Sequence, residues 1–149
     1  MDVREEQQMA HFAKLDTENN VVKVYRVSNK QLLDSDGNES EERGAAFLST
    51  LFGEGVYRQT SYNTRRGEHQ LGGTPLRANY CGKGWKYNPD LDIFHPQQPY
   101  PSWTLDEVKG QWIPPVPYPE NELEEGERPP MYQWNEGEQQ WDLIEAPNE

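Results

Sequence analysis

Cysteine, histidine and long apolar runs are scarce in this chain of 149 residues. The one cysteine, Cys81, excludes a disulfide within the chain and is typical of proteins made in a reducing compartment. The three histidines, His11, His69 and His95, share no ligand spacing with each other or with Cys81, so we expect no zinc site. No apolar run reaches the length of a membrane span, and residues 1–8 lack the apolar stretch of a signal peptide. The sequence therefore predicts synthesis in the cytoplasm without membrane insertion.

Core-forming residues are also limited. Only 33% of the residues are apolar, and the mean hydropathy of -1.09 leans toward the composition of disordered proteins. Five Trp and eight Tyr indicate the opposite, because each aromatic ring can bury roughly 150–250 Å². We expect a folded chain with thin cores and long polar segments.

The charge is strongly negative and unevenly placed. A net charge of -12 and a pI near 4.6 disfavour nucleic acid as a partner, because duplex binding depends on neutralising phosphates. Residues 120–149 hold ten acids and one base, while residues 58–86 hold a single acid, Glu68. The two regions could pair within or between copies, or each could simply be solvated. The predicted basic patch comprises Arg58, Arg65, Arg66, Arg77, Lys83 and Lys86.

The first half of the chain reads as a small α+β domain. Alternation over residues 11–15 and a β-branched run over 21–27 predict a hairpin. Ser40 is a good N-cap, and the apolar spacing that follows predicts a helix ending at Gly53. Further along, the pattern predicts a strand over 56–62, a Gly-rich loop over 65–74 and a strand over 79–87.

The second half contains a repeat. Shifting Trp85–Pro101 by eighteen residues superposes it on Trp103–Pro119, matching the aromatic and proline positions together. Each unit predicts a short hairpin followed by a proline-rich strap, and Trp134–Trp141 is a shortened third unit. Because an isolated hairpin is marginally stable, each unit needs a surface to pack on.

These patterns predict a mostly-β α+β chain, with a small hairpin-helix-strand domain followed by short aromatic hairpins joined by straps. The predicted divisions are a polar arm (1–8), an α+β domain (9–84), two hairpin-and-strap repeats (85–119), an acidic linker (120–131) and a C-terminal hairpin with a tail (132–149).

No motif predicts catalysis or a cofactor. Asp34, Asp36 and Asn38 fit the start of a calcium loop, but Glu39 and Ala45 stand where that loop needs its glycine and its bidentate acid, so we expect an Asx turn. The Gly82–Gly84 segment lacks the strand-loop-helix setting of a phosphate loop. We expect no enzyme, no metal and no cofactor.

The aromatic residues allow two interpretations. Spaced rings could stack on sugars, or they could form the hairpins' own cores and contacts with other proteins, which we favour. The candidates for packing or interface roles are Trp85, Phe94, Tyr100, Trp103, Trp112, Tyr118, Trp134 and Trp141.

Several segments together resemble small structural or uncharacterised proteins of tailed bacteriophages, especially marine phages of cyanobacteria. They span most of residues 9–120 and comprise Met9–Asp16, Asn20–Val22, Val27–Asn29, Gln59–Asn63, the Arg77-x-Asn79-Tyr80 run, the Gly82-x-Gly84 run and Pro101–Trp103. The family offers no catalytic residues to carry over. The resemblance implies a virion component.

The expected function is therefore that of a non-enzymatic structural protein in a phage virion, as a decoration, cement or connecting subunit on the capsid exterior or tail. Its expected partners are other virion proteins, in multiple copies of a symmetric assembly. Two alternatives stay open: a tail-tip module that binds a receptor or glycan, and an assembly chaperone that is not retained in the particle.

Overall fold

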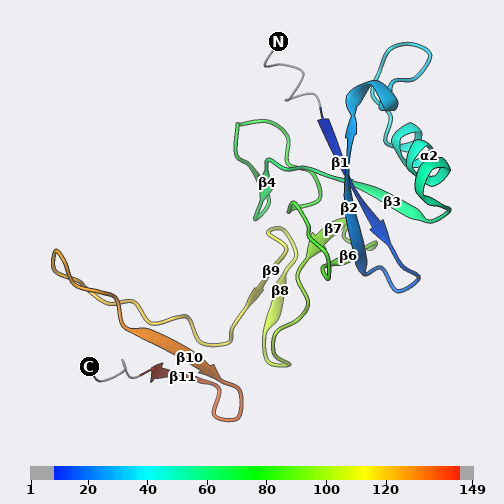
Figure 1. The fold of residues 1–149 in the computed structure, drawn as a ribbon. Helices are drawn as coiled ribbons and strands as arrows, with labels where there is room; N and C mark the ends of the chain where they lie inside the picture. Colours follow the sequence, from blue (N-terminus) through cyan, green and yellow to red (C-terminus); the bar gives the residue numbers. More distant parts are fainter. Residues whose placement is uncertain (1–8, 145–149) are drawn as a thin grey trace. The chain divides into compact units, whose positions relative to one another are not determined.

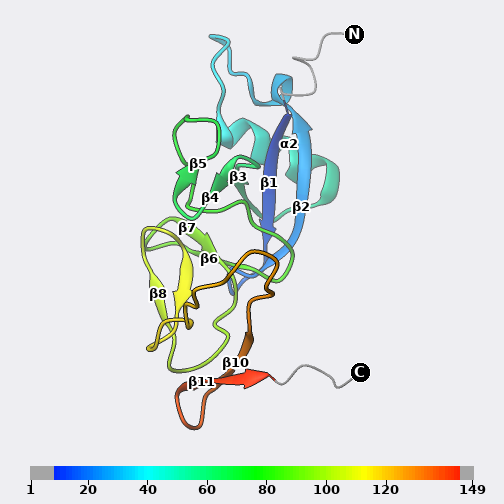
Figure 2. The same cartoon turned by 90° about the vertical axis from the view of Figure 1, so that its left-hand side faces the viewer.

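A computed structural model describes residues 9–144 of the chain. The predicted arm over 1–8 and the last residues of the predicted tail, 145–149, lie outside the described residues. The described part is mostly β-structure with one α-helix, which confirms the coarse α+β class (Figures 1 and 2).

The chain divides into two compact units, which are described separately. The described part of unit 1 comprises residues 9–97 and Asp106–Gln111, and that of unit 2 comprises Gln98–Leu105 and residues 112–144. Unit 1 thus extends further along the chain than the predicted boundary at residue 84.

Unit 1 is built on a three-stranded antiparallel sheet. Its strands are β1 (Met9–Leu15), β2 (Val21–Ser28) and β3 (Val56–Thr60), in the order β2-β1-β3. The predicted hairpin is therefore confirmed as β1–β2. Its turn depends on Asp16, whose carboxylate accepts hydrogen bonds from the backbone N–H groups of Glu18 and Asn20.

The helix α2 (Glu41–Phe52) begins and ends as the sequence predicts. The Ser40 hydroxyl accepts a hydrogen bond from the Arg43 N–H. Glu41 and Glu42 in the first turn stabilise the helix, because their negative charges interact favourably with the positive end of the helix dipole. Gly53 follows at φ 100°, a backbone angle that only glycine adopts readily. A single 3-10 turn, η1 (Asn29–Leu32), lies between the sheet and α2.

The two faces of the sheet support two small cores, because side chains alternate along each strand. On one face, Phe12 and Tyr57 pack with Leu48 of α2. Figure 1 shows α2 beside the three-stranded sheet. On the other face, Ala13 and Leu15 of β1 and Val21 of β2 pack with Cys81, Tyr87 and Phe94 from later in the chain. The second core fixes the β6–β7 hairpin (Lys86–Asn88 and Ile93–His95) on the sheet of unit 1.

Short hairpins occur at the three positions predicted from the repeat. They are β6–β7, β8–β9 (Thr104–Asp106 and Gln111–Ile113) and β10–β11 (Met131–Asn135 and Gln140–Ile144). The proline-rich segments that follow the first two hairpins contain no strand.

Two sequence-based predictions in unit 1 are wrong. The loop over 65–74 contains a small hairpin, β4–β5 (Thr64–Arg65 and Glu68–His69), because Arg66 and Gly67 both adopt positive φ in its turn. The strand over 79–87 is limited to β6, since Gly82 and Trp85 form a turn and the backbone of Asn79 and Cys81 bonds the Thr60 hydroxyl instead of a strand.

The Asx turn predicted at Asp34 is confirmed. The Asp34 carboxylate accepts hydrogen bonds from the backbone N–H groups of Asp36 and Asn38, at 2.9 Å each. Gly37 follows with a φ of 82°.

Candidate interaction site

The aromatic residues of unit 2 gather around Trp103. Its ring centroid lies 5.6 Å from that of Tyr100, 5.8 Å from Trp134 and 6.0 Å from Trp141. Trp134 and Trp141 face each other across β10–β11 at 5.1 Å, in an edge-to-face arrangement. These are favourable geometries for aromatic pairs, so the three tryptophans bury much of their surface on one another.

Glu136 secures this cluster with three hydrogen bonds. Its carboxylate accepts from the Ser102 hydroxyl at 2.6 Å, from the Ser102 N–H at 3.1 Å and from the Trp134 Nε1–H at 2.9 Å. The hydrogen bond from the Ser102 hydroxyl, followed by that from Trp134, lowers the pKa of Glu136. Because Glu136 belongs to the β10–β11 turn, it ties that hairpin to the segment around Ser102.

The second proline-rich segment packs on the same hairpin. Trp141 donates its Nε1–H to the Val116 carbonyl at 2.8 Å, and the Tyr118 hydroxyl accepts the Tyr132 N–H at 3.1 Å. The Tyr118 ring contacts the rings of Tyr132 and Trp141, 5.6 and 4.9 Å away. The prolines restrict the segment to extended geometry, which lowers the entropy lost when it lies along the hairpin.

The aromatic cluster around Trp103 contains a hydrogen-bond donor without a partner among the described residues, and few of the residues around it are buried. The Trp103 Nε1 is buried and has no hydrogen-bond partner within residues 9–144. Among the described residues of unit 2, only Trp134 is buried, at 6% exposure. Seven large apolar residues of this unit are exposed, namely Ile113, Val116, Tyr118, Leu123, Met131, Leu143 and Ile144.

The predicted aromatic residues do not form one set. Tyr100, Trp103, Trp112, Tyr118, Trp134 and Trp141 belong to unit 2, whereas Trp85 and Phe94 belong to unit 1. Phe94 is fully buried in the second core and Trp85 packs against it. Trp112, the position equivalent to Phe94 in the repeat, is half-buried. The repeat thus reproduces hairpins but not their environments.

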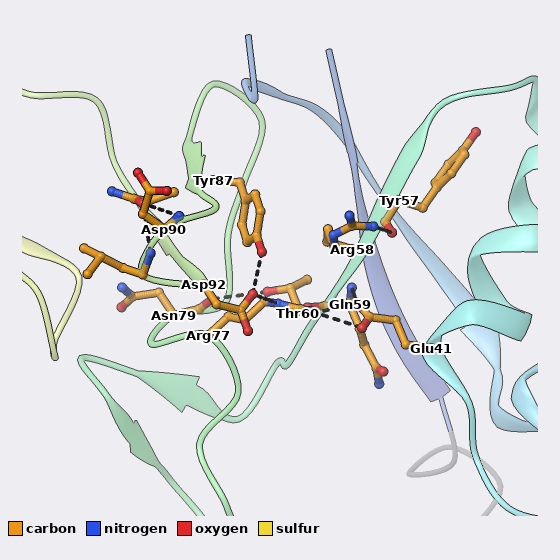
Figure 3. A network of polar contacts seen from close by, with 12 residues as sticks. Glu41, Tyr57, Arg58, Gln59, Thr60, Arg77, Asn79, Tyr87, Asp90 and Asp92 are labelled. Carbon is orange, nitrogen blue, oxygen red and sulfur yellow. Dashed lines mark hydrogen bonds and ion pairs between the residues drawn. The ribbon is translucent and has the colours of Figure 1, made fainter. Parts of the chain in front are cut away.

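Arg77, one residue of the predicted basic patch, lies in a polar network rather than on an open surface (Figure 3). Its guanidinium forms ion pairs with Glu41 and with Asp92, and it also donates to the Gln59 carbonyl at 2.8 Å. Burial lowers the pKa of Arg77, but the hydrogen bonds and charges of Glu41 and Asp92 outweigh it and raise that pKa overall. Arg77 is therefore a fixed cation within the fold.

Tyr87 extends the network by donating its hydroxyl to Asp92 (Figure 3). Burial, and then the hydrogen bond to Asp92, raise the pKa of Tyr87. Burial tends to raise the pKa of Asp92, yet the bonds from Tyr87 and Arg77 lower it overall. Each shift stabilises the existing charge states, which suits a structural network.

The other members of the predicted basic patch differ in exposure. Arg65, Arg66 and Lys83 are exposed, whereas Arg58 and Lys86 are half-buried. No described acid forms an ion pair with these five residues.

Asn79 is a structural residue that sequence reasoning missed. Its buried side-chain amide donates to the carbonyls of Phe94, Lys109 and Gly110 at 2.9–3.1 Å and accepts the Arg66 N–H at 2.9 Å. Asn79 therefore ties together the β4–β5 turn, strand β7 and the β8–β9 turn within unit 1. Gly110 has a φ of 61°, and a Cβ there would lie 2.5 Å from the Asn79 amide nitrogen, so this contact requires glycine at position 110.

Cys81 lies in the second core and is a packing residue. Burial raises the pKa of its thiol to about 11, so the thiol is protonated at neutral pH and a poor nucleophile. Over residues 9–144, no three His, Cys, Asp or Glu side chains gather as metal ligands would. The same residues include no helix long and apolar enough to cross a membrane.

Comparisons with known proteins supply no family for this chain. No protein-family model, no curated protein and no solved structure matches it. The site is therefore interpreted from its own residues.

Proposed function

We propose that this chain is a non-enzymatic structural subunit whose unit 2 completes its core on the surface of a partner protein. The observation that carries the proposal is the single buried residue, Trp134, among the described residues of unit 2. A hairpin with so little buried surface is marginal in water. Unit 2 has ordered aromatic packing but almost no buried core, which is expected of a segment whose remaining contacts are supplied by a partner protein.

The exposed apolar side chains indicate where that partner binds. Met131, Leu143 and Ile144 lie on the two paired strands of β10–β11, and Met131 is directly opposite Ile144. Because side chains alternate along a strand, Met131 and Ile144 share one face of the hairpin, which we call the apolar surface of unit 2. Leu143 lies on the other face, with Trp134 and Trp141. Tyrosine, tryptophan and methionine are typical of the centres of protein interfaces.

The resemblance to small proteins of tailed phages favours a virion as the setting. The subunit would then decorate, cement or connect the subunits of a capsid or tail. It would itself be present in multiple copies in this symmetric assembly. The acidic region over 120–127 and the exposed Arg65, Arg66 and Lys83 offer charge pairing between neighbouring subunits. Such pairing contributes to specificity more than to affinity.

Mass spectrometry of purified particles of the encoding phage tests this proposal. We expect the chain to be present in stoichiometric, repeated copies. Its presence in infected-cell lysate but not in particles would overturn the proposal and would favour an assembly chaperone. Hydrogen exchange adds a local measurement: the amides of β10–β11 are expected to be protected much more strongly in the particle than in the free protein.

A further inference from the structure

Unit 1 has a hollow at one end of the sheet face that carries the second core. Arg26 of β2, His11 of β1 and Thr60 of β3 lie in register across the sheet, and their side chains share this face. The second core packs around Ala13 and Leu15, further along β1. The end of the face at His11 is thus not filled by that core.

The hollow has a volume of about 760 Å³, and ten of the described residues line it, including His11, Arg26, Tyr62 and Asn63. Small-molecule sites typically have volumes of roughly 300–1,000 Å³ and combine aromatic walls with a few polar groups. This hollow has both properties, and it uses residues outside the interaction site of unit 2.

Tyr62 forms a fixed aromatic platform in the hollow. Its ring stacks on His11 at 5.9 Å, with an interplanar angle of 26°, and meets Tyr80 edge-to-face at 5.5 Å. Tyr80 also contacts His11, so the three rings support one another. Tyr62 is nevertheless 61% exposed. An exposed ring held in one orientation suits stacking against a flat, partly apolar ligand.

The charge of the hollow contrasts with that of the protein. Among the described residues that line it, Arg26 is the only charged one and none is an acid, although the chain carries a net charge of -12. Within residues 9–144, neither the Arg26 guanidinium nor the Asn63 side-chain amide has a hydrogen-bond or ion-pair partner. A guanidinium in this setting favours a carboxylate, which it can bind with two parallel hydrogen bonds.

We propose that this hollow binds an acidic sugar, a hexuronate unit of a polysaccharide. The C–H face of the sugar ring stacks on Tyr62, the carboxylate pairs with Arg26, and the Asn63 amide bonds ring hydroxyls. A phosphate-rich nucleic acid fits less well, because the chain carries a net charge of -12. This inference goes beyond the structural role proposed above and does not depend on it.

The test titrates the full-length, ¹⁵N-labelled protein with two matched probes. One is the α-1,4-linked tetramer of galacturonic acid, and the other is the α-1,4-linked tetramer of glucose. We expect amide shifts at Tyr62 and Asn63 and about tenfold tighter binding of the galacturonate tetramer, as for one charge-assisted interaction. Absence of shifts at the hollow with both probes would overturn the proposal.

Three variants identify the contacts. Tyr62→Ala is expected to weaken binding of both tetramers by about tenfold, while Tyr62→Phe retains binding. Arg26→Gln removes the preference for galacturonate and leaves the glucose tetramer unchanged. Lys23→Gln, the matched charge control on the same strand, leaves both affinities unchanged. Equal effects of Arg26→Gln and Lys23→Gln would overturn the proposal. Binding of tetraglutamate as tightly as the galacturonate tetramer would also overturn it and would identify an acidic-peptide site.

Discussion

Arg77 and Glu41 lie 36 residues apart in sequence, and together they close the free edge of β3. Glu41 accepts the Gln59 N–H, and Arg77 donates to the Gln59 carbonyl. The ion pair thus occupies the place that a neighbouring strand would take beside Gln59. An open strand edge invites pairing with other chains, and this pair protects it.

The first prediction concerns this ion pair. Arg77→Ala is expected to lower the free energy of unfolding by about 3 kcal/mol, because it leaves Glu41 partly buried without its partner. Urea denaturation followed by circular dichroism measures the change. Arg65→Ala, which removes an exposed arginine, is expected to change the stability by less than about 0.5 kcal/mol. Equal losses in the two variants would contradict a structural role specific to Arg77.

The second prediction concerns the contact between α2 and the sheet. A Cβ added at Gly44 would lie 2.5 Å from the Phe12 ring, which is fully buried. Gly44→Ala is therefore expected to destabilise the protein by about 1–3 kcal/mol, although the same change in an exposed helix stabilises by about 1 kcal/mol. Thermal unfolding measures the loss. In the Phe12→Leu background the cost of Gly44→Ala should be smaller, and purely additive losses would contradict the predicted clash.

The third prediction concerns Cys81. A thiol pKa of about 11, against an ordinary value of 9.0, reduces the thiolate fraction near neutral pH about 100-fold. Modification by a disulfide reagent at pH 8 should be at least that much slower in the native protein than in urea. Equal rates in both conditions would show that the thiol is accessible.

The same shift makes the stability depend on alkaline pH. Folding raises the pKa of Cys81, so its contribution is complete below the unfolded value near 9 and is lost as the pH rises toward about 11. Cys81→Ala is expected to show a shallower fall in the free energy of unfolding over this range. Parallel pH profiles for the two proteins would refute the assignment.

The fourth prediction concerns acid sensitivity of unit 2. Hydrogen bonds from Ser102 and Trp134 lower the pKa of Glu136, so its contribution is present above the ordinary carboxyl pKa and is lost as the pH falls through the lowered value. Glu136→Gln should weaken the near-ultraviolet circular dichroism of the tryptophans at neutral pH and reduce its acid dependence. Glu138→Gln, an exposed change in the same turn, should leave the signal unaltered.

The fifth prediction concerns the apolar surface of unit 2. Met131→Ser and Ile144→Ser remove exposed side chains of this surface, so the stability of the free protein should change by less than about 0.5 kcal/mol. Incorporation into particles should fall strongly, as measured by mass spectrometry. Val108→Ser, at an exposed apolar residue of unit 1, is the control. Normal incorporation of the two unit 2 variants would contradict the proposed interface.

Local structure was largely predictable from sequence. The β1–β2 hairpin, the Ser40 and Gly53 ends of α2, the Asp34 turn and the hairpins of the repeat all depend on alternation, capping and turn chemistry, which act over a few residues. The predicted strand over 79–87 is wrong outside β6, because the Thr60 hydroxyl and the Gly82–Trp85 turn satisfy its backbone in place of a neighbouring strand.

The sequence by itself determined that the chain forms small β-hairpins rich in aromatic residues, because strand alternation and turn formation depend on residues that are close together in the chain. Only the tertiary structure decided what each ring and charge does. Phe94 is buried in the second core, whereas Trp112 at the equivalent position of the repeat is half-buried. Arg77 forms an ion pair with Glu41 and is not a surface cation. The hollow at Tyr62 likewise unites residues of three strands and two loops. Such roles depend on contacts between distant segments, which no local pattern encodes.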